Sequence, residues 1–360
     1  MKSYIVEKEA ILHNLDILLK KAGEVPLWAV LKGNGYGLGL APMAELCLQA
    51  GVNHFAVTEL SEVETLRQMA PQAQILLLRP TTDEAELGRL LDADGIATIG
   101  SVQDAAALNG LAVKRDMVAA VHVKIDTGMG RYGFLPEELQ DILSVYRSHD
   151  HLAVSGIYTH FACAFCSGKI TYRQYDAFRK TVVAIAEAGV EPGAPHCCNS
   201  NAFMRYGDLK MDGVRVGSAL LGRVAFKKNL RRVGRCEAAV EQVRWLPKGH
   251  ATGYGSAWHA KRPTQIAVLP VGWYHGFAAE YGNDIFRFRD CLRQMFGAMK
   301  RMIFKKKIYV TINGKSCPVL GHVGMLHTVC DVTKISCQPG DPAVLDINPL
   351  QLHGMDVEFR

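Results

Sequence analysis

Residues 26–37 have the sequence PLWAVLKGNGYG, and the architecture follows from this stretch and from others like it. Its apolar run ends at Lys32 and passes at once into a glycine-rich turn, which is typical of a buried strand leading into a loop. Helical patterns alternate with such runs as far as residue 220. Eight strands in this alternation favour a (β/α)8 barrel over an open doubly wound sheet. The other seven runs are 54–58, 74–79, 95–99, 117–126, 153–160, 194–199 and 214–218.

The pattern changes after about residue 235, where short apolar runs alternate with turns. Residues 309–320 predict a hairpin around Asn313-Gly314, because Asn-Gly is the preferred pair for a tight two-residue turn. We therefore expect a barrel over residues 1–234 and a β-rich domain over residues 235–360. A basic, helix-like segment at about 284–307 interrupts this second domain. The other predicted strands there are 265–271, 328–333 and 343–346, with a further run at 317–323.

Composition excludes several classes of protein. The chain has 360 residues, 49% of them hydrophobic, and a formal net charge of +6, which is ordinary for a folded soluble protein. It contains no apolar run of the ~18 residues that a spanning helix needs, and its N-terminus lacks the apolar region of a signal peptide. We therefore expect a cytoplasmic protein with neither a membrane nor a nucleic-acid partner. The densest basic run, 305–307 with Lys300 and Arg301, is interpreted as a solvated face, with an anionic partner as the alternative.

Polar residues gather where the predicted strands end, and the active site of a (β/α)8 barrel lies at that end. A lysine that ends a buried strand is unusual, and a desolvated lysine can form a Schiff base with a carbonyl such as that of pyridoxal phosphate. The alternative is a lysine that simply emerges into solvent. Serines near the last two strands suit a phosphate site, although each alone is equally a helix cap. The residues concerned are Lys32, Lys124, Asp126, His160, Asn199, Ser200, Arg215, Gly217 and Ser218.

Several motifs, in order and spacing, resemble those of the alanine racemase family, which are fold type III pyridoxal-phosphate enzymes. The resemblance covers nearly the whole chain and implies a (β/α)8 barrel, a C-terminal β domain and a homodimer. It also implies a racemase that interconverts L- and D-alanine with pyridoxal 5'-phosphate. The motifs are AVLKGNGYG at 29–37, KIDTGMGRYGF at 124–134, YTHFA at 158–162, NSNA at 199–202, VRVG at 214–217 and GYGS at 253–256.

The resemblance also implies a role for each residue. Lys32 would hold the cofactor and act as a base on one face of the substrate, and Tyr254 of the partner subunit would act on the other face. Two opposed bases suit racemisation, in which a proton leaves one side and returns on the other. Lys124 would be a carbamylated lysine that orients Arg131; the alternative is an unmodified lysine paired with Asp126. Further cofactor contacts are implied for Tyr36, His160, Asn199, Ser200, Arg215, Gly217 and Ser218, and substrate contacts for Arg131 and Met325.

The departures from the family pattern cluster in the β domain. Trp273 stands where the family has a tyrosine at the substrate entrance, and His275 and Leu326 stand where it has acids. These changes alter the size and polarity of the region that limits a substrate side chain. Alanine remains the expected substrate, with serine or another amino acid as the alternative.

Two other classes of function stay open. The pair Cys163 and Cys166 with His160 would suit a zinc or redox site. The group of His322, His327 and Cys330 resembles the metal ligands of related barrel enzymes, which would imply a metal-assisted lyase or aldolase acting on D-amino acids; the alternative is that these histidines lie at surface or hairpin positions. We expect no metal, because the first group lacks a second cysteine pair to close a four-ligand set. A non-catalytic pyridoxal-phosphate carrier is the other alternative, and the second domain with its Tyr254 argues against it.

Overall fold

The computed structural model describes residues 2–226, 229–279, 288–303 and 308–360. The chain forms two compact units. One comprises Glu7–Val233, and the other comprises residues up to Val6 together with Gly234–Arg360. The sequence predicts a boundary after residue 234 with the N-terminal segment in the barrel; in the structure, the residues up to Val6 belong to the β unit. Tyr4, Ile5 and Val6 are fully buried there, because β1 (Lys2–Val6) lies between two strands of a sheet.

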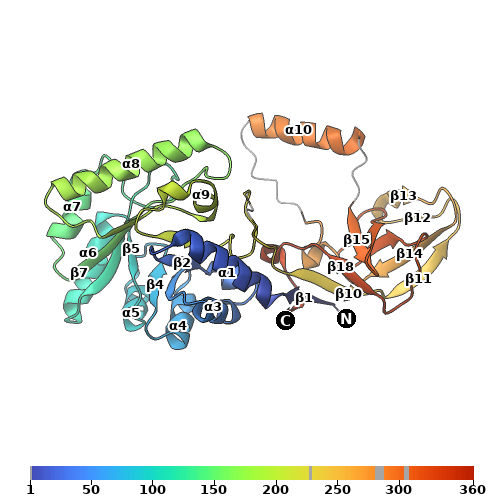
Figure 1. Ribbon diagram of the computed structural model, residues 1–360, viewed down its shortest axis with the longest axis horizontal. Helices are drawn as coiled ribbons and strands as arrows, with labels where there is room; N and C mark the ends of the chain where they lie inside the picture. The colour runs from blue at the N-terminus through green and yellow to red at the C-terminus, as the bar shows by residue number, and fades with distance from the viewer. Residues whose placement is uncertain (1, 227–228, 280–287, 304–307) are drawn as a thin grey trace. The chain divides into compact units, whose positions relative to one another are not determined.

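The larger unit is a (β/α)8 barrel, as expected (Figure 1). Two four-stranded parallel sheets, in the orders β4-β3-β2-β9 and β5-β6-β7-β8, are joined by single parallel bridges at Leu76–Ile96 and Cys198–Val214. All eight predicted strands are present. They could be predicted because strands that are buried on both faces appear in the sequence as continuous apolar runs. The strands are β2 (Leu27–Val30), β3 (His54–Val57), β4 (Gln74–Leu77), β5 (Ala97–Ile99), β6 (Ala119–Lys124), β7 (Leu152–Tyr158), β8 (Ala194–His196) and β9 (Val214–Val216).

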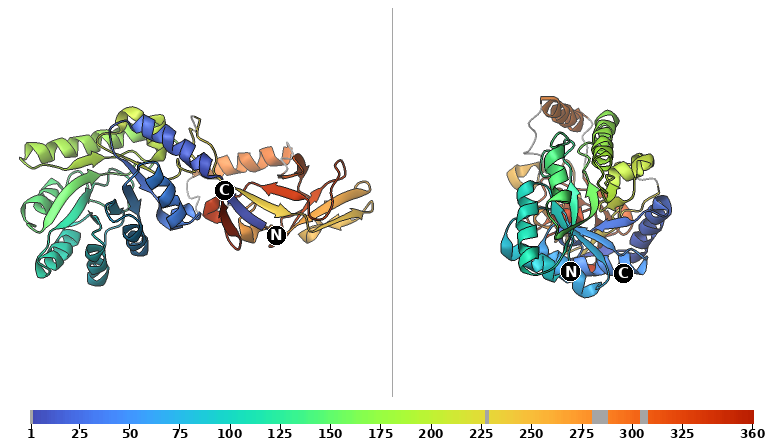
Figure 2. Two further views of the ribbon diagram at one scale, coloured as in Figure 1. Left: turned by 60° about the horizontal axis from the view of Figure 1, so that its bottom comes forward. Right: turned by 90° about the vertical axis from the view of Figure 1, so that its left-hand side faces the viewer.

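Helices surround these strands (Figure 2, right). In the first helix, Ile11, Leu15 and Leu18 recur at helical spacing and are fully buried, so one face covers the barrel. Gly23 ends that helix with φ of 68°, a conformation that glycine adopts without steric cost. The helices are α1 (Lys8–Ala22), α2 (Lys32–Tyr36), α3 (Leu40–Gln49), α4 (Leu60–Met69), α5 (Glu84–Asp92), α6 (Val102–Lys114), α7 (Leu139–Arg147), α8 (Gly168–Glu187) and α9 (Ser200–Arg205), with a 3-10 turn η1 (Gly207–Leu209).

The smaller unit is built of antiparallel strands and one parallel pair. Its main sheet has the order β16-β15-β18-β10-β1-β19, in which β1 runs parallel to β19, and β11-β14-β17 form a second sheet. The predicted hairpin is confirmed by β15 and β16 around Asn313 and Gly314, which have φ of 48° and 73°. The elements are β10 (Arg235–Ala239), β11 (Gln242–Leu246), β12 (Ala251–Thr252), η2 (Tyr254–Ser256), β13 (Trp258–His259), β14 (Thr264–Leu269), η3 (Trp273–His275), β15 (Tyr309–Ile312), β16 (Lys315–Pro318), β17 (Thr328–Asp331), β18 (Pro342–Leu345), η4 (Pro349–Gln351) and β19 (Asp356–Phe359).

The basic segment predicted at 284–307 is helical over the part that the structure describes. This helix is α10 (Phe288–Ile303), and residues 284–287 and 304–307 lie outside the described residues. Among the described helices, none is both long and apolar enough to span a bilayer.

Candidate active site

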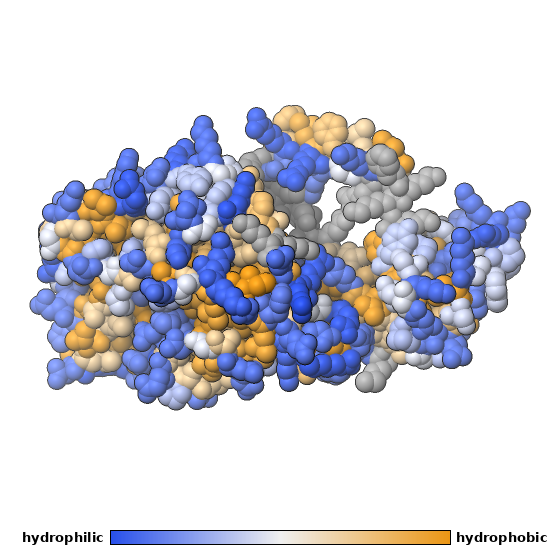
Figure 3. Space-filling view, viewed as in Figure 1, coloured by the Kyte–Doolittle hydropathy of each residue, from blue (hydrophilic) through white to orange (hydrophobic). Residues whose placement is uncertain are grey.

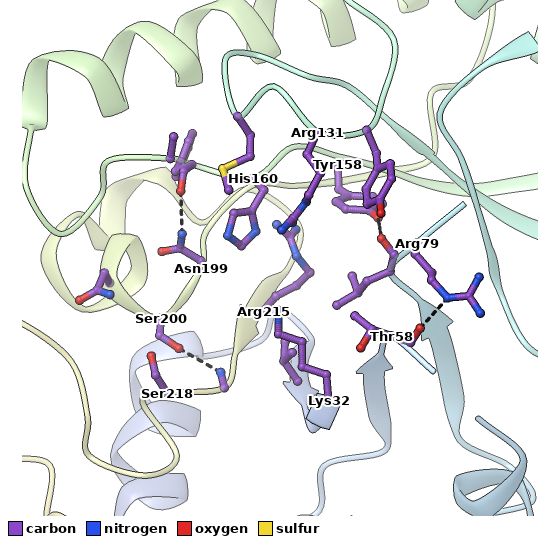
Figure 4. Close-up of a pocket in the computed structure, with 18 of the residues that line it drawn as sticks. Lys32, Thr58, Arg79, Arg131, Tyr158, His160, Asn199, Ser200, Arg215 and Ser218 are labelled. Carbon is purple, nitrogen blue, oxygen red and sulfur yellow. Dashed lines mark hydrogen bonds between the residues drawn. The ribbon is translucent and has the colours of Figure 1, made fainter. Parts of the chain in front are cut away.

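An open cavity of about 520 Å³ lies at the carboxyl ends of the barrel strands (Figure 4). The parallel direction of the strands explains why these residues lie together, since the residues that follow each strand all lie at the same rim of the barrel. Figure 4 shows Arg215 between Lys32 and His160, with Ser200 and Ser218 to one side. Asp126 does not line this cavity. The barrel residues for which the family resemblance implies a cofactor or substrate role do line it, together with Lys124: Lys32, Tyr36, Lys124, Arg131, His160, Asn199, Ser200, Arg215, Gly217 and Ser218.

Lys32 begins a left-handed turn, α2, directly after β2. Gly33, Asn34 and Gly35 have φ of 64°, 54° and 63°, which explains why glycine and asparagine occupy these positions. The buried carboxylate of Glu62 accepts a hydrogen bond from the Asn34 N–H at 2.8 Å and holds the turn. Burial lowers the pKa of Lys32, the charge of Arg131 lowers it further, and Glu62 opposes both. The amine is therefore more readily neutral than an exposed lysine, as a base or nucleophile requires.

Arg215 is the most constrained cation of the site. Its side chain comes from the inward face of β9 and is only 3% exposed. One guanidinium nitrogen donates to Nδ1 of His196 at 2.7 Å and to the His196 carbonyl at 2.9 Å. The other donates to the Thr159 carbonyl at 2.5 Å. These bonds fix the orientation of the positive charge at the base of the cavity.

Lys124 and Arg131 add two more cations, and Asp126 organises the loop between them. The carboxylate of Asp126 accepts four backbone N–H groups, from residues 128 to 131, at 2.7–3.1 Å. Burial alone would raise the pKa of Asp126, but these donors outweigh it and hold the pKa below its usual value. Lys124 is 4% exposed, and its amine lies 4.4 Å from the centre of the Tyr158 ring. Burial, followed by the charges of Arg215 and Arg131, lowers the pKa of Lys124 to about 7.

Ser200 lies at a crowded junction that suits an anion. Its Oγ accepts the Gly217 N–H at 2.9 Å and the Ala219 N–H at 3.2 Å, so its own hydroxyl hydrogen is left to donate. Asn199, not Ser200, is the residue that caps α9, since its side chain accepts the Ala202 N–H at 3.0 Å. A Cβ at Gly217 would collide with the Tyr36 hydroxyl, so only glycine allows the two to lie together. The hydroxyl groups of Tyr36, Ser200 and Ser218 line this part of the cavity.

His160 follows β7 and lines the same cavity. Burial, and then the charges of Arg215 and Lys124, hold its pKa well below the usual histidine value, so its ring is neutral. The neighbouring Cys163 and Cys166 belong to one turn, in which the Cys166 N–H donates to the Cys163 carbonyl at 2.9 Å. No group of three or more metal-ligating side chains occurs among the residues that the structure describes.

Tyr254 and Met325 lie in the other unit, in a separate hollow of about 590 Å³ that also includes Leu326. Tyr254 is 73% exposed. The N–H of Trp273 donates to the Gly324 carbonyl at 3.0 Å, so the two segments that depart from the family pattern lie side by side. His275 is buried beneath them, where its Nδ1 accepts the Gly272 N–H at 3.1 Å. His275 therefore shapes the loop rather than lining the hollow.

Two residues of the barrel site went unnoticed in the sequence. Arg79 lines the cavity, donates to the Thr58 carbonyl at 2.9 Å and pairs with Glu86 at 2.6 Å. A signal was available, because Arg79 ends the predicted strand 74–79 as Lys32 ends its own. Glu62 offered a weaker signal, as an acid in the first turn of a predicted helix.

The fold and the site define a two-unit barrel protein with a basic, hydroxyl-lined cavity at the barrel mouth and a desolvated lysine in it. Such a cavity suits a ligand that carries an anionic group. Comparison with known proteins identifies the family. The model of the alanine racemase N-terminal domain matches residues 6–225, and that of the C-terminal domain matches residues 233–351. The chain belongs to the alanine racemase family.

Individual relatives agree with this assignment. The chain is 30% identical to the alanine racemase of Symbiobacterium thermophilum, over 94% of this chain and 86% of that protein. It is 31% identical to the alanine racemase of Desulforamulus reducens, over 92% and 85%. Among solved structures, the alanine racemase of Clostridium difficile 630 superimposes with a TM-score of 0.84 at 25% identity, over 100% and 95% of the two chains.

Proposed function

We propose that the protein is a pyridoxal-phosphate-dependent racemase that interconverts L- and D-alanine. The observation that carries the proposal is the cavity at the barrel mouth, in which a desolvated Lys32 lies among four further basic side chains, one of which, Arg79, is paired with Glu86. A cofactor phosphate and a substrate carboxylate are both anions, and Arg131 and Arg215 supply positive charge to the cavity that receives them. Membership of the alanine racemase family supports the same conclusion.

The residues of the barrel suit the cofactor. The phosphate would occupy the part of the cavity lined by Tyr36, Ser200, Gly217 and Ser218, where hydroxyl groups are present and the Ser200 hydroxyl hydrogen is left to donate. Lys32 would form the covalent attachment. Arg215 would face the ring nitrogen as a donor that is always charged, and His160 and Asn199 would contact the ring or its substituents. When bound, pyridoxal phosphate supplies the electron sink for the charge that remains when an α-proton leaves an amino acid.

The protein itself moves the proton. The amino group of the substrate would replace Lys32 in the covalent attachment. The freed neutral amine of Lys32 would then take the α-proton from one face of the substrate, which its lowered pKa favours. The Tyr254 hydroxyl returns a proton on the opposite face, and the roles reverse for the other enantiomer. Arg131 binds the substrate carboxylate, held by the loop that Asp126 organises. Met325 borders the space for the side chain.

Tyr254 would act on the barrel of a partner subunit, so that the working unit is a homodimer with two equal sites. The exposure of Tyr254 supports this, because a side chain that is accessible on the surface of its own unit can contact the active site of another subunit. A fully active monomer would contradict this arrangement.

Lys124 would be carbamylated. Carbamylation joins the nitrogen of a neutral amine to the carbon of carbon dioxide, and one N–H proton leaves to water. A pKa lowered to about 7 makes the neutral amine abundant near neutral pH. The product is an anion between Arg131 and Arg215, where a buried cation is unfavourable.

The test is chiral product analysis in heavy water. The purified protein, loaded with pyridoxal phosphate, is incubated with each common L-amino acid, and D-isomer and α-deuterium are measured. D-alanine is expected from L-alanine. A D-isomer from serine or a larger amino acid instead would place Trp273 and Leu326 among the determinants of specificity. An aldehyde or keto acid product that a chelator abolishes would indicate the metal-assisted lyase.

The variant Tyr254→Phe distinguishes a racemase from a non-catalytic carrier of pyridoxal phosphate. A racemase loses turnover but keeps the visible absorbance of its bound cofactor, whereas a carrier is unaffected. Tyr309→Phe is the matched control, since Tyr309 is also exposed in the same unit but lies on β15. Absence of exchange with any amino acid, in protein that holds the cofactor, would refute the racemase.

A further inference from the structure

Helix α10 presents one continuous apolar face. Its large apolar residues recur at intervals of three and four, so they lie on the same side of an α-helix. Six of them are between 44% and 76% exposed. Figure 3 shows apolar side chains gathered along one edge of this helix and charged ones along the other. The six exposed residues are Phe288, Met295, Phe296, Met299, Met302 and Ile303.

A strip of cations runs beside the apolar face. Arg289, Arg293 and Lys300 are spaced by four and seven residues, so they share one side of the helix next to Phe296. The polar side carries one acid, Asp290, in the first turn. Along the ~24 Å of a 16-residue helix, cationic and apolar side chains therefore form two parallel strips.

We propose that α10 is an interfacial helix that binds the protein to the surface of an anionic lipid bilayer. Two parallel strips match a surface that is negatively charged at one depth and apolar at the next, which is how lipid headgroups and acyl chains are arranged. Arginine and lysine have long aliphatic stems, so their charged ends reach the headgroups while the apolar side chains lie deeper. Met is unbranched and adapts to fluid chains, and Phe is common on the apolar face of interfacial helices.

Two expectations from the sequence concern such a partner. The absence of an 18-residue apolar run argues against spanning a bilayer, but lying on its surface needs only one apolar face. In the sequence, the basic run 305–307, with Lys300 and Arg301, is interpreted as a solvated face, with an anionic partner as the alternative. Residues 305–307 lie outside the described residues, and in α10 itself six exposed apolar residues beside the cations favour the anionic partner.

The experiment is cosedimentation of the intact holoenzyme with phosphatidylcholine vesicles, prepared with and without phosphatidylglycerol. Binding is expected to the anionic vesicles, to weaken as salt is added, and to be far weaker on neutral ones. Arg293→Gln with Lys300→Gln should lower the partition coefficient about 30-fold, equivalent to about 2 kcal/mol for two cations. Lys248→Gln with Lys315→Gln is the matched control, with the same charge change on exposed lysines elsewhere in the unit.

A second pair of variants tests the apolar face. Phe296→Ser with Met299→Ser should reduce binding about 100-fold, whereas Trp245→Ser with Leu350→Ser, at exposed apolar positions outside α10, should not. The proposal fails if the wild type does not bind anionic vesicles. It also fails if each control pair reduces binding as much as the α10 pair that it matches. A change of oligomeric state in Phe296→Ser with Met299→Ser would also contradict the proposal, as would loss of binding to an acidic protein that the wild type binds. In either case α10 would contact protein rather than lipid. Racemase turnover is measured in parallel, so loss of the proposed activity is recognised separately.

Discussion

Replacing Lys124 by methionine should change how the stability of the barrel depends on pH. The Lys124 amine is buried, and burial together with Arg215 and Arg131 lowers its pKa from 10.5 to about 7. Methionine has a similar shape and no charge, so it removes the titration with little change in packing. The pH dependence of the difference between the two proteins therefore isolates this one group.

The sign and size follow from proton linkage. Below about pH 7 both the folded and the unfolded chain carry the Lys124 proton, and the folded protein bears the full cost of the buried charge. Between about pH 7 and 10.5 only the unfolded chain carries it, so stability rises with pH by up to about 1.4 kcal/mol per pH unit. From pH 7 to 9 this amounts to about 2–3 kcal/mol, or roughly 5–10 °C in the Tm of a domain of this size.

The assay is thermal unfolding of the cofactor-free protein across this pH range, in buffers free of carbon dioxide. The Tm advantage of Lys124→Met over the wild type should be largest near pH 7 and should shrink towards pH 9. Lys169→Met, at an exposed lysine of α8, is the control and should show no such trend. A Tm difference that stays constant from pH 7 to 9 would refute the reasoning. Bicarbonate should stabilise the wild type and Lys169→Met but not Lys124→Met, because Lys124 supplies the amine that would be carbamylated.

Three further substitutions test the remaining parts of the site. Ser200→Ala leaves two buried N–H groups without an acceptor, so we expect a loss of about 2–4 kcal/mol in stability, read from Tm. It should also weaken cofactor binding at least about 10-fold by absorbance titration, and unchanged affinity would exclude Ser200 from the phosphate site. Asp126→Asn loosens the loop that carries Arg131, so KM for alanine should rise about 10-fold or more while the cofactor stays bound; an unchanged KM would contradict this. Gly217→Ala collides with Tyr36 and should weaken cofactor binding more than it lowers Tm, which parallel titration and melting measure; equal loss in both would indicate simple misfolding.

Much of the fold is local in origin and could be predicted. All eight barrel strands were recognised because a strand buried on both faces is a short apolar run between turns. The turn after Lys32 could also be predicted, since Gly33 and Gly35 readily adopt the left-handed conformation that the turn needs. The candidate residues of the barrel follow from the same logic, because parallel strands place whatever follows them at one rim.

Other features depend on pairings between distant residues. β1 joins the β unit because it pairs with β10 and β19, more than 200 residues away, and nothing in its own apolar sequence specifies that choice. Ser200 could equally have capped a helix, and only its contact with the Gly217 N–H separates the two roles. The sequence by itself therefore determined which segments are strands and which residues meet at the barrel rim, because both depend on local patterns of apolar and turn-forming residues. Tertiary structure alone decided which sheet β1 entered, how far the Lys124 amine was desolvated and which polar groups became partners, because burial and long-range hydrogen bonds exist only once the chain has folded.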